Sequence, residues 1–356
     1  MAVSRYLRYM VEAGASDLHL KVGLPPVIRV DGLIHHTPFE ALAAEDTESL
    51  ASELIPKQKL QDFNDGHEVD VGFTLPEVAR FRVNAYRQRG YVSVAIRLVR
   101  SEIPTFESLG LPDGVAKLAQ EHRGLVLVTG PAGTGKTTTI ASMIGWINAN
   151  RQAHIVTIED PIEVVHEDVR SVVEQREIGL DTVSYSAALR SAVRQDPDVI
   201  FIGEIRDLET VEAAIQAAET GHMVIATLHT LDATETVNRI IDLFPHEMQQ
   251  QARVALAASL KGVISQRLVP QADGHGRLPA VEVLLNTGRV AERIIDPEQT
   301  FTIPDVMKEG EYYGMQTFDQ ALVRMVRAGT VTVEAAKEAA TNPHDLSLAL
   351  QAAQLV

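Results

Sequence analysis

The spacing of apolar residues changes along the chain and predicts two regions of different architecture. Near the start, short stretches alternate apolar and polar positions, as half-buried strands do. These stretches are 16–22, 27–30, 68–73, 79–85 and 91–98, with amphipathic helices expected over 3–13 and, in two pieces, over 45–64. The pattern predicts a small α+β domain, residues 1–100, built on an antiparallel sheet.

Farther along, continuous apolar runs alternate with helical periodicity. Strands are expected near 125–129, 154–158, 198–202 and 223–228, and helices near 137–149, 184–195, 207–219, 232–242 and 246–260, with a helical tail over 288–350. Fully buried parallel strands have this continuous apolar character, so we expect an α/β domain over 115–356. Its sheet is predicted to be mostly parallel, and a linker rich in Pro and Gly, 101–114, precedes it.

One loop between a predicted strand and a predicted helix fits G-x-x-x-x-G-K-[ST], the pattern of a phosphate-binding P-loop. Its residues are Gly130, Pro131, Ala132, Gly133, Thr134, Gly135, Lys136 and Thr137, and we add Thr138 behind them as a nucleotide contact. Backbone N–H groups and the helix N-terminus would hold the triphosphate of ATP. Lys136 would reach the β- and γ-phosphates, and the Thr137 hydroxyl would bind Mg²⁺. The alternative, a Gly-rich turn without function, fits the strand–loop–helix context poorly.

Acidic residues follow two of the predicted strands. The run 198–202 leads to Glu204, where an acid would reach Mg²⁺, usually through water. Glu159, Asp160 and Glu163 lie within five residues after the strand near 154–158. Three such carboxylates cannot all be buried and ionised, and one of them would orient or activate the attacking water. Exposed acids in solvated turns are the alternative in both places.

Two histidines flank the predicted strand near 223–228. The seven extended residues from His222 to His229 span roughly 23 Å, so the two rings cannot share one site within a subunit. His229, at the carboxyl end, is the candidate that senses the γ-phosphate, whereas His222 taken alone is more often structural.

Arginines supply the positive charge that phosphoryl transfer requires. Arg190 and Arg194 are four residues apart and share a helix face, and four more arginines lie in the N-terminal hairpin: Arg80, Arg82, Arg97 and Arg100. Each of them taken alone is more often a surface cation.

Composition narrows the function classes. The formal charge is −16, which argues against a nucleic-acid motor with a broad basic surface. The absence of cysteine excludes disulfides and thiolate zinc sites. No stretch approaches the roughly 20 apolar residues of a membrane span, and we expect a soluble, cytoplasmic protein.

Four ordered motifs carry a family resemblance. They are the P-loop, 158–163, 196–207 and 220–229, and they resemble the Walker A, Asp box, Walker B and His box of the type II/type IV secretion ATPase superfamily. Within it, the chain is similar to the pilus retraction ATPases (PilT-like), because Ser16-Asp-Leu-His19, Arg80-Phe-Arg-Val-Asn84 and Gly314-Met-Gln-Thr-Phe-Asp319 also match. The resemblance covers residues 3–340 or so.

The resemblance implies a PAS-like N-terminal domain, a RecA-like ATPase domain and a homohexameric ring. It implies that Glu163 is the catalytic glutamate and Glu204 the Walker B acid. It further implies that Arg82 and Arg97 reach the nucleotide, with Arg190 and Arg194 nearby. His222, the other histidine of the His box, is counted with the nucleotide-binding residues.

We therefore expect a motor that uses ATP and Mg²⁺ to retract a type IV pilus from the inner-membrane base. An inner-membrane platform protein and other pilus ATPases are the expected partners, and nucleic acid is not. Extension ATPases usually carry four zinc-binding cysteines and extra N-terminal sequence, both absent here. The stretch 290–298 departs from the retraction pattern, which leaves an accessory retraction paralogue open. An extension or secretion motor, a nucleotide-regulated scaffold and a DNA translocase are rival functions that the residues favour less.

Overall fold

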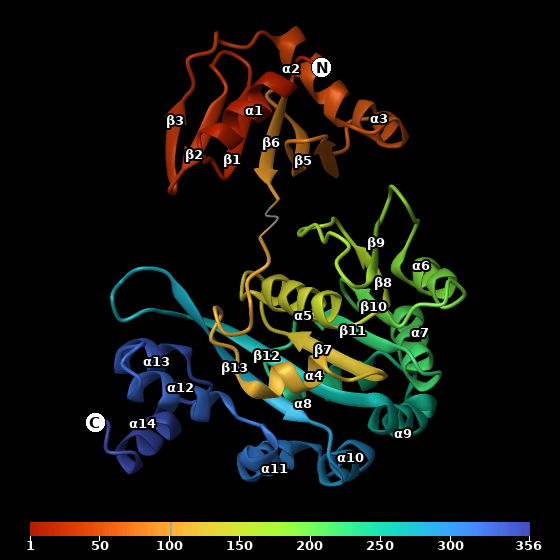
Figure 1. Ribbon diagram of the computed structural model, residues 1–356, viewed down its shortest axis with the longest axis vertical. Coiled ribbons are helices and arrows are strands. Elements are labelled where there is room, and N and C mark those ends of the chain that lie inside the picture. The colour runs from red at the N-terminus through yellow and green to blue at the C-terminus, as the bar shows by residue number, and fades with distance from the viewer. Residues whose placement is uncertain (100–101) are drawn as a thin grey trace. The chain divides into compact units, whose positions relative to one another are not determined.

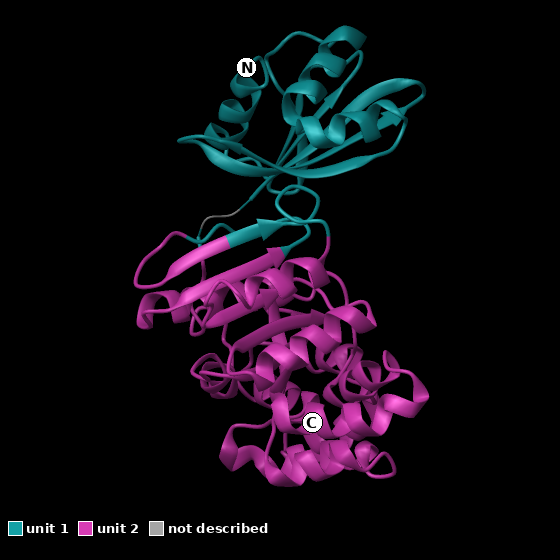
Figure 2. Cartoon of the chain, turned by 90° about the vertical axis from the view of Figure 1, so that its right-hand side faces the viewer, with its two compact units in different colours: residues 1–102, 159–166, 175–183 teal, residues 103–158, 167–174, 184–356 magenta. Residues whose placement is uncertain are grey.

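The computed structural model describes residues 1–99 and 102–356. Internal contacts divide the chain into two compact units (Figure 2). Unit 1 comprises Met1–Glu102, Glu159–His166 and Gln175–Val183, and unit 2 comprises Ile103–Ile158, Glu167–Glu174 and Ser184–Val356. Arg100 and the first linker position, 101, lie outside the described residues. Among the described residues, no helix is long and apolar enough to cross a membrane.

Unit 1 contains an antiparallel sheet and three helices. The helices are α1 (Ser4–Glu12), α2 (Ala44–Leu54) and α3 (Lys57–Asn64). The strands are β1 (Asp17–Lys21), β2 (Val27–Val30), β3 (Leu33–His36), β4 (Val69–Leu75), β5 (Ala79–Gln88) and β6 (Tyr91–Leu98). Among the described residues these six strands are ordered β3-β2-β1-β6-β5-β4.

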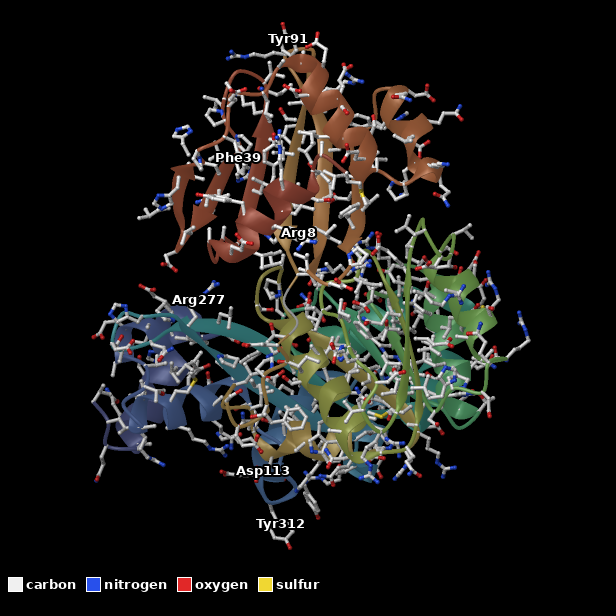
Figure 3. The ribbon with its side chains drawn as sticks, turned by 45° about the horizontal axis from the view of Figure 1, so that its top comes forward. Arg8, Phe39, Tyr91, Asp113, Arg277 and Tyr312 are labelled. Atoms are coloured by element: carbon white, nitrogen blue, oxygen red, sulfur yellow. The ribbon has the colours of Figure 1, made fainter. Side chains whose placement is uncertain are left out.

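Strand β5 shows how the sequence builds the two faces of this sheet. Phe81, Val83 and Ala85 point to one face and are fully buried in the core, together with residues from all three helices. Since side chains alternate along a strand, Arg80 and Arg82 point to the opposite face. On the core side, the ring of Phe39 (labelled in Figure 3) packs edge-on against Tyr6, 4.9 Å between ring centroids.

Unit 2 is built on a mostly parallel sheet, to which two strands shared with unit 1, β8 and β9, also belong. The strands are β7 (Gly124–Thr129), β8 (His154–Glu159), β9 (Val172–Glu177), β10 (Val199–Ile202), β11 (Met223–Leu228), β12 (Leu260–Pro270) and β13 (Arg277–Leu285). Within the described ranges their order is β13-β12-β7-β11-β10-β8-β9. The pairs from β12 through β8 are parallel, and β13 is antiparallel to β12.

Helices cover both faces of this sheet (Figure 1). They are α4 (Asp113–Ala119), α5 (Lys136–Asn150), α6 (Tyr185–Ala192), α7 (Leu208–Glu219), α8 (Ala233–Asp242), η1 (His246–Met248) and α9 (Gln249–Ser259). Every residue of β7 is buried, and alternate side chains of a strand face opposite sides, so both faces must be covered. Val126 and Val128 pack in one core cluster with Ile140 and Met143 of α5.

The C-terminal region is helical, as predicted. It contains α10 (Gly288–Ile295), η2 (Thr300–Thr302), α11 (Ile303–Glu309), η3 (Gly310–Tyr313), α12 (Phe318–Arg327), α13 (Val333–Ala339) and α14 (Pro343–Ala352). Thr317 caps α12 by accepting the N–H of Gln320, whose side-chain oxygen accepts the N–H of Thr317 in return.

The predicted fold class is confirmed, with a mostly parallel α/β sheet preceded by a smaller α+β region. The sequence patterns missed several elements, namely β3, β9, the long hairpin β12–β13 and α4. Helix α4 begins at Asp113, inside the stretch expected to be a linker, because Pro112 precedes the helix as its N-cap.

Candidate functional site

The P-loop has the predicted strand–loop–helix context, between the end of β7 and the start of α5. Gly135, the N-cap of α5, has φ 90°, a left-handed conformation that glycine adopts most readily. At Gly130, an added Cβ would lie 2.5 Å from the carbonyl oxygen of Gln266 on β12. The close approach of β12 therefore requires glycine at the first position of the loop.

Lys136 is buried at the centre of the loop. Its Nζ donates hydrogen bonds to the carbonyl oxygens of Gly130, 2.6 Å, and Pro131, 2.9 Å. The same nitrogen lies 3.4 Å from Nδ1 of His229. Gly130 is buried as well, whereas the rest of the loop is accessible, with Pro131, Ala132, Gly133 and Thr138 exposed and Thr134, Gly135 and Thr137 half-buried.

Three adjacent strands of unit 2 bring their carboxyl ends to one edge of the sheet. Lys136 follows β7 through the P-loop, His229 follows β11 and Glu204 comes shortly after β10. His229 Nε2 lies 3.5 Å from Glu204 Oε1, so the imidazole bridges the lysine and the carboxylate. The structure thus brings together three of the predicted catalytic residues.

Buried hydroxyl groups lie directly behind this edge. Thr129, the residue before the P-loop, donates to Ser265 Oγ of β12, 3.0 Å. Thr236 of α8 contacts the hydroxyls of Thr129, 3.5 Å, and Thr230, 2.6 Å. The segment after His229 is therefore tied to the start of the P-loop by polar contacts within the core.

The donor types at this edge suit a magnesium ion. Thr137 offers a hydroxyl on the first turn of α5, and Glu204 offers a carboxylate that is 18% exposed. Mg²⁺ prefers oxygen ligands and usually keeps several waters, so one or two protein ligands beside phosphate oxygens suffice. No cluster of three or more His, Asp or Glu side chains arranged to hold a metal occurs among the described residues.

The acidic residues at the end of β8 and directly after it lie in unit 1, in a segment we call the acid loop, residues 159–166. Of its first carboxylates, only Glu159 is buried; Asp160 is exposed, and the Glu163 side chain is 44% exposed. The bond between Asp160 and Pro161 is cis. Glu163 is therefore accessible, as an acid that acts on water must be.

Arg82 and Arg97 face each other across the β5–β6 ladder of unit 1. Arg82 Nη1 lies 3.3 Å from Glu163 Oε1, and its Nε lies 3.6 Å from Asp70 Oδ1. Arg97 instead donates to Asp17 Oδ1 of β1, 2.8 Å. Burial, the largest single effect, disfavours the charged form of Asp17, but the hydrogen bonds from Arg97 and Ser16 and the nearby charges of Arg97 and His19 together outweigh it, so the pKa of Asp17 is lowered from its ordinary value.

Three further predicted nucleotide-binding residues contact other groups of unit 2. His222 precedes β11, at the opposite edge of the sheet from the P-loop, and its Nδ1 contacts the carbonyl oxygen of Ala217, 2.9 Å. Arg190 pairs with Glu209, 3.4 Å, and Arg194 donates to the Arg190 carbonyl oxygen, 2.5 Å.

Arg206 is a site residue that the sequence analysis did not single out. Its Nη2 lies 2.6 Å from Glu204 Oε2, so the acid that would hold the metal already pairs with a cation. A sequence signal for it existed, because Arg206 lies two positions after Glu204 within the Walker B-like motif, residues 196–207.

Comparison with known proteins shows the class to which this site belongs. The family model described as Type II/IV secretion system protein matches residues 3–340, and the chain belongs to this family. A Pseudomonas aeruginosa relative, the type IV pilus retraction ATPase PilT, is 41% identical over 97% of this chain and 100% of its own length. A second from that organism, the type IV pilus ATPase PilU, is 41% identical over 99% of this chain and 92% of its own.

A solved structure agrees with these relatives. The crystal structure of the pilus retraction motor PilT with bound ADP is 45% identical and superimposes with a TM-score of 0.88, covering 97% of this chain and 98% of that one. The chain is accordingly similar to the PilT-type ATPases along nearly its whole length.

Proposed function

We propose that this chain is a Mg²⁺-dependent ATPase that acts as a ring of six copies and drives retraction of a type IV pilus. The observation that carries the proposal is the convergence of Lys136, His229 and Glu204 on the P-loop edge of unit 2. Full-length similarity to PilT supports the same function. We place the ring at the cytoplasmic face of the inner membrane, beside a platform protein of the pilus.

Residues of unit 2 would bind the nucleotide. The N-terminus of α5 and the loop amides attract phosphate oxygens, and Lys136 would exchange its two carbonyl contacts for the β- and γ-phosphates. Thr137 and Glu204 would hold Mg²⁺, which when bound neutralises charge on the phosphate oxygens. His229, beside both Lys136 and Glu204, is placed to respond to the γ-phosphate.

Residues of unit 1 would complete the chemistry. Glu163 would polarise the attacking water, and Arg82 and Arg97 would supply cations to the transferring phosphoryl group. In this proposal, closure of the two units over the nucleotide delivers these side chains and is the force-producing step. Arg190, Arg194 and His222 have contacts elsewhere, and we assign them no step.

A second candidate function is that of an accessory retraction ATPase working beside another pilus ATPase. Two observations favour it: the equal identity to PilT and PilU, and the departure of the 290–298 stretch from the retraction pattern. Both candidates share the same hydrolytic site.

Phosphate release by the purified chain tests the shared chemistry. Wild-type protein should release phosphate from ATP only with Mg²⁺, and Glu163→Gln should lose turnover, by about 100-fold or more, because an amide cannot accept the proton of water. ATP binding should persist in Glu163→Gln, whereas Glu204→Gln should weaken Mg²⁺-dependent binding. Wild-type turnover by Glu163→Gln would remove this residue from the proposed mechanism, and a stimulation by DNA would favour a translocase.

A further inference from the structure

Two side chains of β9, Gln175 and Glu177, hold the acid loop in place within unit 1. They are two residues apart on the strand and point to the same side. Gln175 Nε2 donates to Glu159 Oε1, 3.1 Å, and to the carbonyl oxygen of Val164, 2.8 Å, and its Oε1 accepts the N–H of His166, 2.9 Å. Glu177 Oε2 accepts the N–H of Ile162, 3.2 Å.

Glu177 also contacts the antiparallel sheet of unit 1. Its Oε1 accepts the N–H of Gly72 on β4, 2.8 Å, and its Oε2 forms an ion pair with Arg80 on β5. A Cβ added at Gly72 would lie 2.6 Å from Glu177 Oε2 and closer still to the Arg80 guanidinium. The Glu177 carboxylate can therefore lie at this position only because Gly72 has no side chain.

Donors from three segments surround the buried carboxylate of Glu177. Its side chain is only 2% exposed, and a buried carboxylate is tolerated when donors satisfy its oxygens. Three donors from separate segments do so here: Gly72, Arg80 and Ile162. Any displacement of one segment would leave a buried charge short of a donor, so the three segments are held in fixed register.

We propose that Glu177 is a positioning residue for the hydrolytic reaction. Ile162, whose amide it fixes, directly precedes Glu163, and Arg80, which it pairs with, lies two positions from Arg82 on the same strand face. By fixing both neighbours, Glu177 sets Glu163 against Arg82. This inference rests on the proposed function, since it takes Glu163 to be the residue that acts on water.

A side chain that only stabilised the fold would have different consequences. Loss of a fold contact lowers the melting temperature and leaves kcat of the folded fraction intact. Misplacement of an acid by about 1 Å can instead reduce the rate by about 100-fold while ATP still binds. Measuring kcat, KM and the melting temperature of the same variant therefore separates a positioning role from a fold-stabilising role.

The test compares Glu177→Gln with Glu174→Gln in the full-length protein. Glu177→Gln keeps the shape of the side chain but loses its charge and one of its two acceptor oxygens. We expect its kcat for phosphate release to fall by about 10- to 100-fold, with KM for ATP within about twofold of wild type. Glu174, the exposed neighbour that faces His154, is the matched control and should retain wild-type kcat.

Gly72→Ala provides a second route, should Glu177→Gln fold poorly. It leaves Glu177 intact but fills the space beside its carboxylate, and it should lower kcat in the same way. Wild-type kcat in folded Glu177→Gln or in Gly72→Ala would overturn the inference, as would a loss confined to melting temperature. If Glu163→Gln itself hydrolysed ATP at the wild-type rate, Glu163 would lose its proposed role and the premise of this inference would fail, an outcome distinguishable from wild-type kcat in Glu177→Gln.

Discussion

At the scale of single residues, the two ring nitrogens of His229 face groups of opposite hydrogen-bonding character. Nδ1 lies beside the ammonium of Lys136, which can only donate, and Nε2 lies beside a carboxylate oxygen of Glu204, which accepts. A neutral imidazole with its proton on Nε2 satisfies both neighbours. Both contacts are at the long end of the hydrogen-bond range, so a phosphate group that draws Lys136 away would readily disturb them.

The sequence predicted the residues that motifs place at strand ends and missed those whose partners are remote. Lys136, Glu204 and His229 follow apolar runs at fixed spacing, and parallel strands bring such residues together. Glu177 gave no local signal, because its partner Arg80 is 97 positions away. Long-range pairing of this kind depends on the tertiary fold, and a single sequence does not encode it in any short pattern.

Arg82 and Arg97 allow a prediction at this scale. Arg82→Ala should reduce turnover severely, on the order of 1,000-fold, since an arginine acting on the phosphoryl group contributes about that much. Arg97→Ala should reduce turnover as well, with loss of its Asp17 contact. Both pairs are partly exposed, and such ion pairs contribute about 0–1 kcal/mol, so the melting temperature should change little.

The measurement is phosphate release by the two variants, after their assembly has been compared with wild type. Arg8→Ala, an exposed arginine on α1, is the control and should leave turnover unchanged. Wild-type turnover in both Arg82→Ala and Arg97→Ala would mean that unit 1 supplies no cation to the reaction, and the closure step would have to be abandoned.

At the scale of elements, strands buried on both faces were predictable and the β12–β13 hairpin was not. β7 and β11 are buried throughout and consist mostly of apolar residues, so they cannot be mistaken for surface segments. β12 contains Ser265 and Gln266, which are fully buried but polar. Their partners are Thr129 and Thr139 in neighbouring elements, so the apolar pattern breaks where the core is satisfied by hydrogen bonds.

One buried acid of β13, Glu282, meets the starts of two helices. Its Oε1 accepts the N–H of Ala233, the first residue of α8, 2.8 Å, and its carboxylate also accepts the N–H of Phe318, the first residue of α12. Burial disfavours the charged form, and Asp232 nearby adds to this effect, while Arg267 opposes it. The net result raises the pKa of Glu282 from 4.5 to about 7.

This raised pKa makes stability depend on pH with a definite sign. Between 4.5 and about 7 the folded protein keeps the Glu282 proton, whereas the unfolded chain has lost it. The free energy of unfolding therefore falls as pH rises through this range, by an amount on the order of 3 kcal/mol, and the effect is complete above the folded pKa. Glu282→Gln, which never ionises, should lack this slope.

Melting temperatures of wild type and Glu282→Gln from about pH 5 to about pH 8 check this expectation. The variant should gain stability relative to wild type as the pH rises. Burial also lowers the pKa of His166 to about 4, which gives a slope of the opposite sign, but His166 is present in both proteins and cancels. Parallel curves over the whole range would show that Glu282 does not titrate there.

At the scale of the whole molecule, the residues that the proposed function requires are divided between the two units. Lys136, Glu204 and His229 belong to unit 2, whereas Glu163, Arg82 and Arg97 belong to unit 1. A hydrolytic cycle that needs both sets makes turnover depend on the relative motion of the units, and this dependence would convert ATP hydrolysis into mechanical work.

The measurement that tests the proposed function most directly is pilus retraction in living cells whose only copy of the gene carries Glu163→Gln. Fluorescent labelling of surface pili gives their number and their retraction events, with Glu174→Gln as the control allele. We predict that pili still extend but cease to retract and accumulate on the surface. Loss of all pili would identify an extension motor, and retraction at the wild-type frequency would contradict the proposed function.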